Sequence, residues 1–415
     1  MSYAPFRVTQ DIVCPEPVKS AEALTAIPPS PDTIVPMVVA GIDEAGYGPV
    51  LGPLVVGCCA IASPALAAQG RSATVGAPPA VGDVSCRWAG EPSRLPDGAD
   101  CPGEPSGAKL QNDRASGEGH GAAAAPVGLW PDHWTALRRI VDRRTNPRKL
   151  QINDSKIVYT PAAGLRALEQ SILAIATCRF GQLESLESLL RAVAPGAPGE
   201  LAAHPWYQPE DSEPFPLEID RASAAIMANA LKVELDGCGY SLAHIAAEIV
   251  PELRLNQMFR QTRNKSSTLF SLTAIHIDAL LKRFAGSDLV IVCDRQGSRE
   301  HYGRLLRLLF EPWDLVIERE DEQRSEYVLS RSGRCARLVF ATRSESTCLP
   351  TAVASMLSKY LREVLMRRFN RFWRRHVPRL APTAGYYTDG MRFLREIDAK
   401  RRELGIEPWQ LVRSR

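Results

Sequence analysis

The stretch Met37–Gly57, MVVAGIDEAGYGPVLGPLVVG, decides the fold predicted for this chain. Its first residues, 37–42, are apolar and rich in β-branched side chains, which favours a short buried strand. Two adjacent carboxylates, Asp43 and Glu44, follow this strand, and a glycine-rich turn leads to a second apolar run, 54–61. Burying two acids at the end of a core strand is costly unless a cation compensates them. Mg²⁺ and Mn²⁺ prefer carboxylate oxygens, so the stretch indicates a metal site.

An ordinary acidic turn after a strand is the alternative, since Asp and Gly are common turn residues. The glycines favour the functional interpretation, because small residues such as Gly46 and Gly48 let backbone amides approach a phosphate.

Composition places the chain among globular proteins with a substantial core. It has 415 residues, of which 45% are hydrophobic and 23% charged. The net charge is only +3, but from Arg331 onward Arg and Lys far outnumber Asp and Glu. Ten cysteines without CxxC spacing predict neither a zinc site nor a disulfide framework. No signal-peptide pattern and no apolar run of ~20 residues is evident, so we expect a cytoplasmic protein without a membrane segment.

The domain organisation follows from changes in composition. Residues 1–35 are rich in Pro and Ala and predict a flexible N-terminal arm, ahead of one catalytic domain over 36–415. Within that domain, about 63–127 predicts a disordered insertion and about 195–216 a loop.

Periodicity predicts an α/β domain with alternating strands and helices. Strands are expected at 37–42, 54–61, 288–293, 315–320 and 337–342. Helices are expected at 131–141, 162–175, 219–235, 268–284, 299–310, 350–376 and 388–403.

Further acids follow two other predicted strands. Asp294 ends the strand 288–293, and Glu345 comes shortly after the strand 337–342. Ligands of open α/β sheets usually sit at strand ends, so four carboxylates meeting there could hold two metal ions about 4 Å apart. Taken singly, Asp294 is as consistent with a helix cap and Glu345 with a surface acid. Their joint pattern favours the metal site.

Several motifs, in order along most of the chain, resemble those of the ribonuclease HII and HIII family. GIDEAGYGP resembles the family's GIDEAGRGP, and NDSK at 153–156 is similar to its second motif. The later, weaker matches are VIVCDRQG at 290–297, TRSESTCLPTAVASMLSKYLRE at 342–363 and GYYTDGMRFL at 385–394.

The resemblance implies a ribonuclease H-like fold, a mixed five-stranded sheet flanked by helices, with a C-terminal helical segment. It also implies that Asp43, Glu44 and Asp294 are catalytic, metal-binding acids. An alignment on Ser355 gives Glu345 as the fourth acid, whereas one on Pro350 gives Ser346. Glu345 is preferred because Ser346 cannot supply a charged ligand.

The same resemblance implies a set of substrate-binding residues: Gly46, Tyr47, Gly48, Lys156, Asn264 and Tyr386. Lys156 would approach a phosphate, Asn264 would contact a strand backbone, and Tyr386 would stack on a sugar at an RNA–DNA junction. Ordinary roles are open for these residues, such as a surface lysine or a helix-start aromatic. Tyr47 departs from the family, which has Arg there, so recognition of a single embedded ribonucleotide is in question.

A basic, aromatic helix near the C-terminus fits binding to nucleic acid. Its residues are Lys359, Arg362, Arg367, Arg368, Arg371, Arg374 and Arg375, among Tyr360, Phe369, Phe372 and Trp373. A solvated basic face over packed aromatic residues is the alternative.

The sequence therefore predicts a monomeric, Mg²⁺- or Mn²⁺-dependent endonuclease. It would hydrolyse the RNA strand of an RNA–DNA hybrid and leave 3′-hydroxyl and 5′-phosphate ends. A nuclease for another nucleic-acid structure, or a hybrid-binding protein without turnover, are the alternatives.

Overall fold

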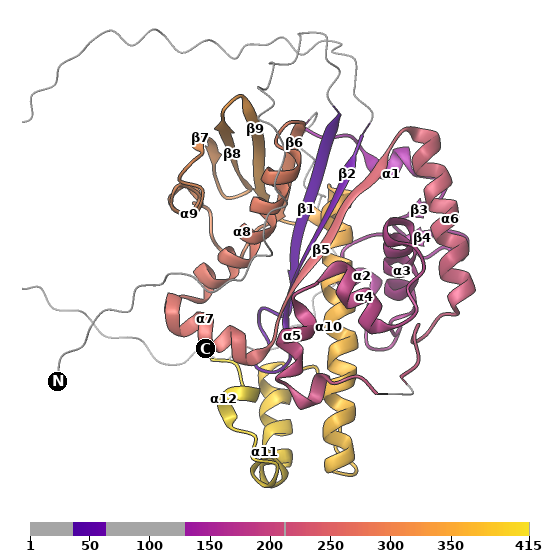
Figure 1. Ribbon diagram of the computed structural model, residues 1–415, viewed down its shortest axis with the longest axis vertical. Coiled ribbons are helices and arrows are strands. Elements are labelled where there is room, and N and C mark those ends of the chain that lie inside the picture. The colour runs from indigo at the N-terminus through magenta and orange to yellow at the C-terminus, as the bar shows by residue number, and fades with distance from the viewer. Residues whose placement is uncertain (1–35, 64–128, 211–212, 415) are drawn as a thin grey trace, which may run out of the picture. The chain divides into compact units, whose positions relative to one another are not determined.

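A mixed sheet of seven strands, in the order β5-β2-β1-β6-β9-β8-β7, forms the centre of the computed structural model (Figure 1). The structure describes residues 36–63, 129–210 and 213–414. The predicted arm at 1–35 and nearly all of the predicted insertion at 63–127 lie outside the described residues. The strands are β1 (Met37–Ala45), β2 (Leu54–Ala62), β5 (Ser241–Val250), β6 (Asp288–Asp294), β7 (Asp314–Glu320), β8 (Arg324–Arg331) and β9 (Arg334–Ala341).

Five neighbouring strands, β5, β2, β1, β6 and β9, form the mixed part of the sheet. Strand β1 pairs antiparallel with β2 and β2 antiparallel with β5, whereas β6 runs parallel to both β1 and β9. The antiparallel pair β7–β8 extends the sheet beyond β9. The predicted fold class, a mixed sheet flanked by helices, is confirmed, with seven strands in place of five.

Within the seven-stranded sheet, the two strands that the sequence pattern missed are β5 and β8. Strand β5 is an edge strand whose first four residues are not buried, and His244 and Glu248 interrupt its apolar sequence. Strand β8, RSEYVLSR, carries charged and polar residues that mask its alternation. Both strands owe their place to tertiary pairing more than to local propensity.

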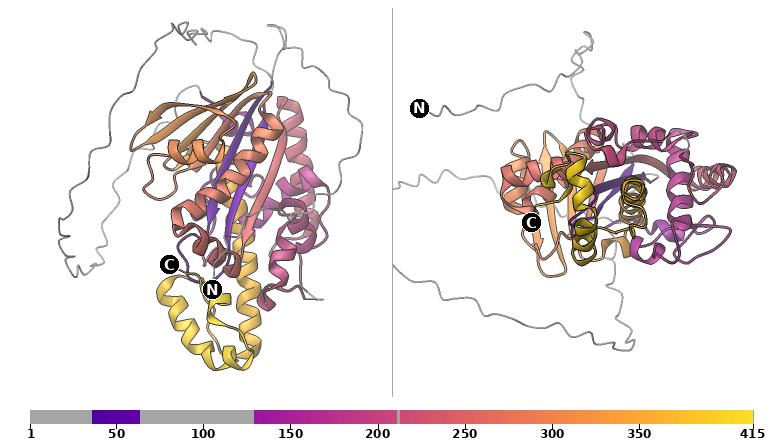
Figure 2. Two further views of the ribbon diagram at one scale, coloured as in Figure 1. Left: turned by 60° about the vertical axis from the view of Figure 1, so that its left-hand side comes forward. Right: turned by 90° about the horizontal axis from the view of Figure 1, so that it is seen from below.

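Helices cover both faces of the sheet (Figures 1 and 2). They are α1 (His133–Ala136), α2 (Ser155–Val158), α3 (Arg166–Phe180), α4 (Leu186–Val193), α5 (Ala197–Ala202), α6 (Arg221–Cys238), α7 (Glu252–Thr262), α8 (Lys265–Phe284), α9 (Gly303–Leu309), α10 (Leu349–His376), α11 (Tyr387–Glu403) and α12 (Pro408–Leu411). Two 3₁₀ helices are η1 (Pro205–Tyr207) and η2 (Ser344–Ser346), and a separate parallel pair is β3 (Val141–Asp142) with β4 (Leu150–Gln151).

Two predicted segments differ from the structure. The helix expected over 131–141 is limited to α1, because Val141 pairs with Leu150 in the β3–β4 pair. The loop expected at 195–216 contains α5 and η1, and it buries Trp206 and Tyr207 against the core. Its prolines start these short helices, since proline is tolerated in a first helical turn.

Strand β2 is buried on both faces, which explains its unbroken apolar sequence. Val55 and Cys59 face the core shared with α3, α6 and α10, whereas Val56 and Cys58 face the core shared with α8.

Glycine allows α10 to lie directly on the sheet. A Cβ at Gly41 of β1 would lie 2.0 Å from the backbone nitrogen of Thr351, and one at Gly57 of β2 would lie 2.6 Å from the carbonyl oxygen of Ala354. The N-terminal half of α10 is therefore held against the strand ends that carry the acids. None of the helices in the described residues is long and apolar enough to cross a membrane.

Candidate active site

Asp43 and Asp294 lie side by side at the ends of the neighbouring parallel strands β1 and β6. Ile42 is paired with Cys293, so the next residue in each strand is one of the two acids. Val39 and Val292 pack together with Cys348, the N-cap of α10. Because side chains alternate along a strand, Asp43 and Asp294 leave the sheet on this same face.

Glu44 and Glu345 complete a group of four acids. Glu345 lies in η2, shortly after β9, close enough to Asp294 for the charge of that acid to raise its pKa. Ser344 fixes Asp294 by donating hydrogen bonds from its backbone nitrogen and hydroxyl to Oδ1, at 3.1 and 3.2 Å. The neighbouring Ser346 turns away and donates to the carbonyl oxygen of Arg343 at 2.7 Å. We call Asp43, Glu44, Asp294 and Glu345 the acid cluster.

Burial and mutual repulsion act together on the acid cluster. Loss of water, then the charges of Glu44 and Asp294, raises the pKa of Asp43 well above its usual value. Burial and Asp294 likewise raise the pKa of Glu44 to about 8 and that of Glu345 to about 7. Burial also raises the pKa of Asp294, against the hydrogen bonds from Ser344. The arrangement favours protonated acids unless a cation is present.

Lys156 is the cation that the sequence supplies to this cluster. It lies in α2, whose first turn is capped by Asp154 of the NDSK motif. Burial alone would lower the pKa of Lys156, but the charges of Asp154, Asp43, Glu345 and Asp294 raise it overall. One exposed ammonium cannot balance four carboxylates, so the cluster keeps an excess of negative charge when ionised.

The chemistry of the acid cluster fits a divalent cation. Oxygen Oε2 of Glu345 is buried and has no hydrogen-bond partner among the described residues. The acids are hard oxygen donors, the type that Mg²⁺ and Mn²⁺ prefer. Among the described residues, however, no three His, Cys, Asp or Glu side chains already have the spacing of a metal-binding group. The residue types therefore fit a metal ion, although their side chains do not have the spacing of metal ligands.

The turn after β1 is held by the C-terminal part of the chain. The carbonyl oxygen of Gly385 accepts hydrogen bonds from the backbone of Val50 at 2.7 Å and Leu51 at 3.2 Å. Arg413, which is buried, donates to the carbonyl oxygens of Gly46 and Pro49. The turn is thus a rigid part of the site.

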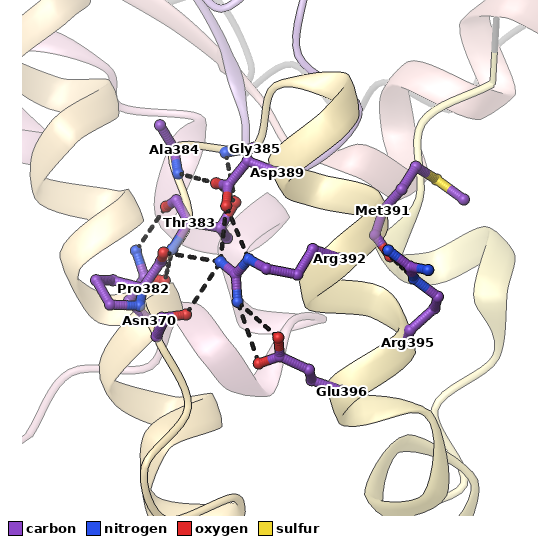
Figure 3. A network of polar contacts seen from close by, with 11 residues as sticks. Asn370, Pro382, Thr383, Ala384, Gly385, Asp389, Met391, Arg392, Arg395 and Glu396 are labelled. Carbon is purple, nitrogen blue, oxygen red and sulfur yellow. Dashed lines mark hydrogen bonds and ion pairs between the residues drawn. The ribbon is translucent and has the colours of Figure 1, made fainter.

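A polar network keeps Gly385 in place for this contact (Figure 3). Asp389 accepts hydrogen bonds from the hydroxyl of Thr383 and the backbone of Ala384, and Arg392 pairs with Asp389. The Thr383 hydroxyl in turn accepts from the backbone of Gly385 at 2.9 Å. Residues of the motif at 385–394 therefore hold the turn that follows β1 in place.

The predicted substrate-binding residues have different surroundings. Gly46 has φ +90°, and a Cβ there would lie 2.5 Å from Nε of Arg362, so only glycine fits without rearrangement. Gly48 is exposed with open space around it. Tyr386 is exposed as the N-cap of α11, directly after Gly385.

Tyr47 lies among two cations and Glu44, a setting that the sequence motifs did not reveal. The ammonium group of Lys265 lies 4.7 Å from the centre of its ring, and Arg299 and Glu44 both act on its hydroxyl. Asn264 precedes Lys265, but its side-chain oxygen caps α8 by accepting from the backbone of Ser267 at 2.9 Å. The structure therefore gives Asn264 a local structural role.

The basic helix expected to bind phosphates is largely neutralised within the protein. Its cations pair as follows: Lys359 with Glu363, Arg367 with Glu218, Arg368 with Glu187 and Glu213, Arg371 with Glu210 and Glu213, and Arg375 with Glu210. Arg362 is buried, as are Tyr360, Phe369 and Trp373. The alternative of a structural helix accounts for most of these residues, and phosphate binding by α10 stays a prediction for its exposed cations, such as Arg374 and Arg375.

No protein-family model matches the sequence, and no curated protein matches it either. Among solved structures, the chain is similar to the ribonuclease HII in its complex with PCNA from Archaeoglobus fulgidus, at 13% identity and a TM-score of 0.34, over 91% of this chain and 94% of that one. It is also similar to Bst-RNase HIII in complex with Mn²⁺, at 12% identity and a TM-score of 0.33, over 92% and 67% of the two chains. Ribonuclease H2 from Pyrococcus horikoshii OT3 gives 12% identity and a TM-score of 0.30, over 90% and 92%. These scores are low, so the fold assignment rests on the order and directions of the strands.

Proposed function

We propose that the protein is a metal-dependent endonuclease that hydrolyses the RNA strand of RNA–DNA hybrids and leaves 3′-hydroxyl and 5′-phosphate ends. The observation that carries this proposal is the acid cluster, in which strand ends bring mutually repelling carboxylates together. Such a group costs stability in a metal-free protein, so its presence is best explained by a ligand that it serves. The motif resemblance of the sequence supports the choice of substrate.

The acid cluster would hold Mg²⁺ or Mn²⁺ through Asp43, Glu44, Asp294 and Glu345. When bound, the metal would lower the pKa of an attacking water and neutralise charge on the leaving oxygen. The chain's own contribution is positioning, because Ser344 fixes the orientation of Asp294 through two hydrogen bonds.

Lys156 would act on the substrate directly. Its ammonium group is held near the acid cluster, where it can donate to a non-bridging oxygen of the phosphate under attack. The rigid turn at Gly46–Gly52 would bring backbone groups and Tyr47 beside the sugar of the same nucleotide.

Cleavage of labelled duplexes by the purified full-length chain tests the proposal. RNA–DNA hybrid, duplex RNA, duplex DNA and branched DNA are incubated with Mg²⁺, with Mn²⁺ or with a chelator. We expect cleavage of the RNA strand of the hybrid, dependent on metal, with products that a 3′-end ligation assay identifies as 3′-hydroxyl ends.

Each alternative has its own signature in this experiment. Metal-dependent cleavage of branched DNA alone would indicate a nuclease with another substrate. Tight binding of the hybrid without cleavage under any metal condition would indicate a hybrid-binding protein.

A further inference from the structure

The segment 138–149, RRIVDRRTNPRK, concentrates positive charge next to the acid cluster. It contains six cations, Arg138, Arg139, Arg143, Arg144, Arg148 and Lys149, and one acid, Asp142. We call residues 138–149 the basic ribbon, since it includes β3 and leads into β4. All five of its arginines are exposed to solvent.

The basic ribbon is held firmly although its cations are exposed. Ile140, Val141 and Leu150 are buried in the core shared with α3 and α6. The side chains of Asp142 and Asn146 each accept a hydrogen bond from the backbone two residues ahead, at 3.0 Å, which fixes the two bends of the connection. The cations are therefore presented by an ordered backbone.

Arg143 joins the basic ribbon to the acid cluster. Its guanidinium group stacks 3.7 Å from the centre of the Trp134 ring and donates to the carbonyl oxygen of Ser346 at 2.7 Å. Ser346 is the residue after Glu345. On the other side, Asn153 of the NDSK motif donates to the carbonyl oxygen of Arg143 at 3.1 Å. The ribbon therefore lies directly beside both Glu345 and the turn that carries Lys156.

The remaining arginines of the ribbon lack the pairing that neutralises α10. Arg138, Arg139, Arg144 and Arg148 form no ion pair with any residue in 36–63, 129–210 or 213–414, and the contact of Lys149 with Asp142 is long, at 3.9 Å. Arg138, Arg143, Arg144 and Lys149 line one hollow of the surface, together with Trp134, Thr135 and two acids, Asp132 and Asp142. The cations outnumber the acids there, so this ordered surface is suited to a polyanion.

We propose that the basic ribbon binds the phosphodiester backbone of the duplex on the η2 side of the scissile phosphate. This inference rests on the proposed function and assigns the phosphate-binding surface to the ribbon in place of α10. Guanidinium groups form paired, charge-assisted hydrogen bonds with phosphate oxygens, and these contacts fix register without reading sequence. Arg143 is held by Trp134 and Ser346, so a phosphate bound to Arg143 would lie at a fixed position relative to Glu345.

The double variant Arg144→Gln/Arg148→Gln tests this assignment. Arg304→Gln/Arg307→Gln is the charge-matched control, because these exposed arginines lie in α9 beside β7, at the opposite end of the sheet (Figure 1). Binding of a labelled, uncut RNA–DNA hybrid is measured by fluorescence anisotropy in chelator, between about 50 and 200 mM KCl, a range over which phosphate contacts weaken strongly.

Each phosphate contact adds about 0.9 to the slope of log affinity against log salt, so two lost contacts remove roughly 1.8. The wild type should then lose ~10-fold more affinity than the ribbon variant over this range of salt. The control should retain the slope of the wild type. In cleavage assays, the KM of the ribbon variant should rise by a larger factor than its kcat falls.

Equal slopes for the ribbon variant and the wild type would overturn the inference. If that variant does not fold, as judged by circular dichroism, Arg138→Gln/Arg139→Gln provides the same comparison. Intact cleavage with unchanged binding would remove the ribbon assignment and leave the proposed function. A wild type that binds the hybrid through the ribbon but cleaves nothing would refute the proposed function and leave the ribbon assignment in place.

Discussion

The acid cluster and the ion pairs between α10 and Glu213 are two groups of buried charge with opposite designs. Arg368 is almost wholly buried, and it pairs with Glu187 and Glu213. Burial would raise the pKa of Glu213, but hydrogen bonds and charges from Arg368 and Arg371 lower it overall. In the acid cluster, burial raises the pKa of every acid, and like charges add to this effect for Asp43, Glu44 and Glu345. The protein neutralises the first group itself, whereas the second, when ionised, has Lys156 as its nearby cation and would be stabilised by a bound metal under the proposed function.

Removing a carboxylate from the acid cluster should have the largest effect on activity. We expect Asp43→Asn or Asp294→Asn to reduce hybrid cleavage by ~10³-fold or more, the upper range for loss of one charge-stabilising group. The metal-free variants should unfold at a higher temperature than the wild type, because like-charge repulsion is relieved. Initial rates and thermal unfolding in chelator measure the two effects.

Asp314→Asn is the matched control, since this exposed acid begins β7, away from the acid cluster. It should change neither quantity appreciably. Full activity in either Asp43→Asn or Asp294→Asn would refute the proposed metal chemistry.

Breaking the paired group should instead affect stability. Arg368→Met leaves Glu213 buried without its main partner, and loss of one member of a buried pair costs about 3 kcal/mol or more. Urea unfolding gives this difference, with Arg374→Met as the control on the same helix. Arg374 is exposed and makes no ion pair with a described residue, so its replacement should stay within about 0.5 kcal/mol. Similar losses for both variants would show that the Arg368 pairs are not special.

The pH dependence of stability should distinguish the two groups further. Glu44 and Glu345 have pKa values of about 8 and about 7 in the folded chain, above the usual value near 4.5. Between about pH 4.5 and pH 8, the folded state therefore binds more protons than the unfolded state. Its stability falls as the pH rises through this range. We therefore expect the metal-free protein to lose stability progressively over this range.

Mg²⁺ should restore more stability at pH 8 than at pH 5, because the ionised acids bind it. Thermal unfolding at several pH values, with chelator or with Mg²⁺, measures this difference. The same curves recorded for Asp43→Asn should be flatter. A metal-free wild type that becomes more stable as pH rises would contradict the raised pKa values.

The sequence predicted the parts of this site that depend on local pattern. Apolar runs predict where strands end, so the positions of Asp43 and Asp294 at strand ends could be predicted from the sequence alone. The ion pairs of α10 were not predicted because the partners, such as Glu213, lie far away in sequence, and only the fold brings them together. The basic ribbon was not singled out from the sequence, and its place beside Glu345 depends on the long-range contact of Arg143 with Ser346. Long-range pairing is what periodicity cannot supply.

Tyr47 provides the smallest and most specific expected effect. The resemblance predicts Arg at this place, and Tyr can stack on a sugar and donate one hydroxyl bond but has no guanidinium fork. We therefore expect the protein to cut duplexes with a run of ribonucleotides faster than duplexes with a single one, because phosphate contacts along a longer RNA tract compensate for weak recognition at the junction.

Tyr47→Arg should narrow that difference in rate. Lys265 and Arg299 already surround position 47, so a new guanidinium group would meet repulsion as well as substrate. The gain on the single-ribonucleotide substrate should thus be nearer to one charge-assisted hydrogen bond than two, about 1.5 kcal/mol or ~10-fold in rate. Initial rates on both substrates for wild type, Tyr47→Arg and the control Tyr47→Phe give the comparison. Equal rates of the wild type on the two substrates would mean that Tyr47 does not limit recognition of the junction. The neighbouring cations, Lys265 and Arg299, would then be sufficient to replace the missing guanidinium group.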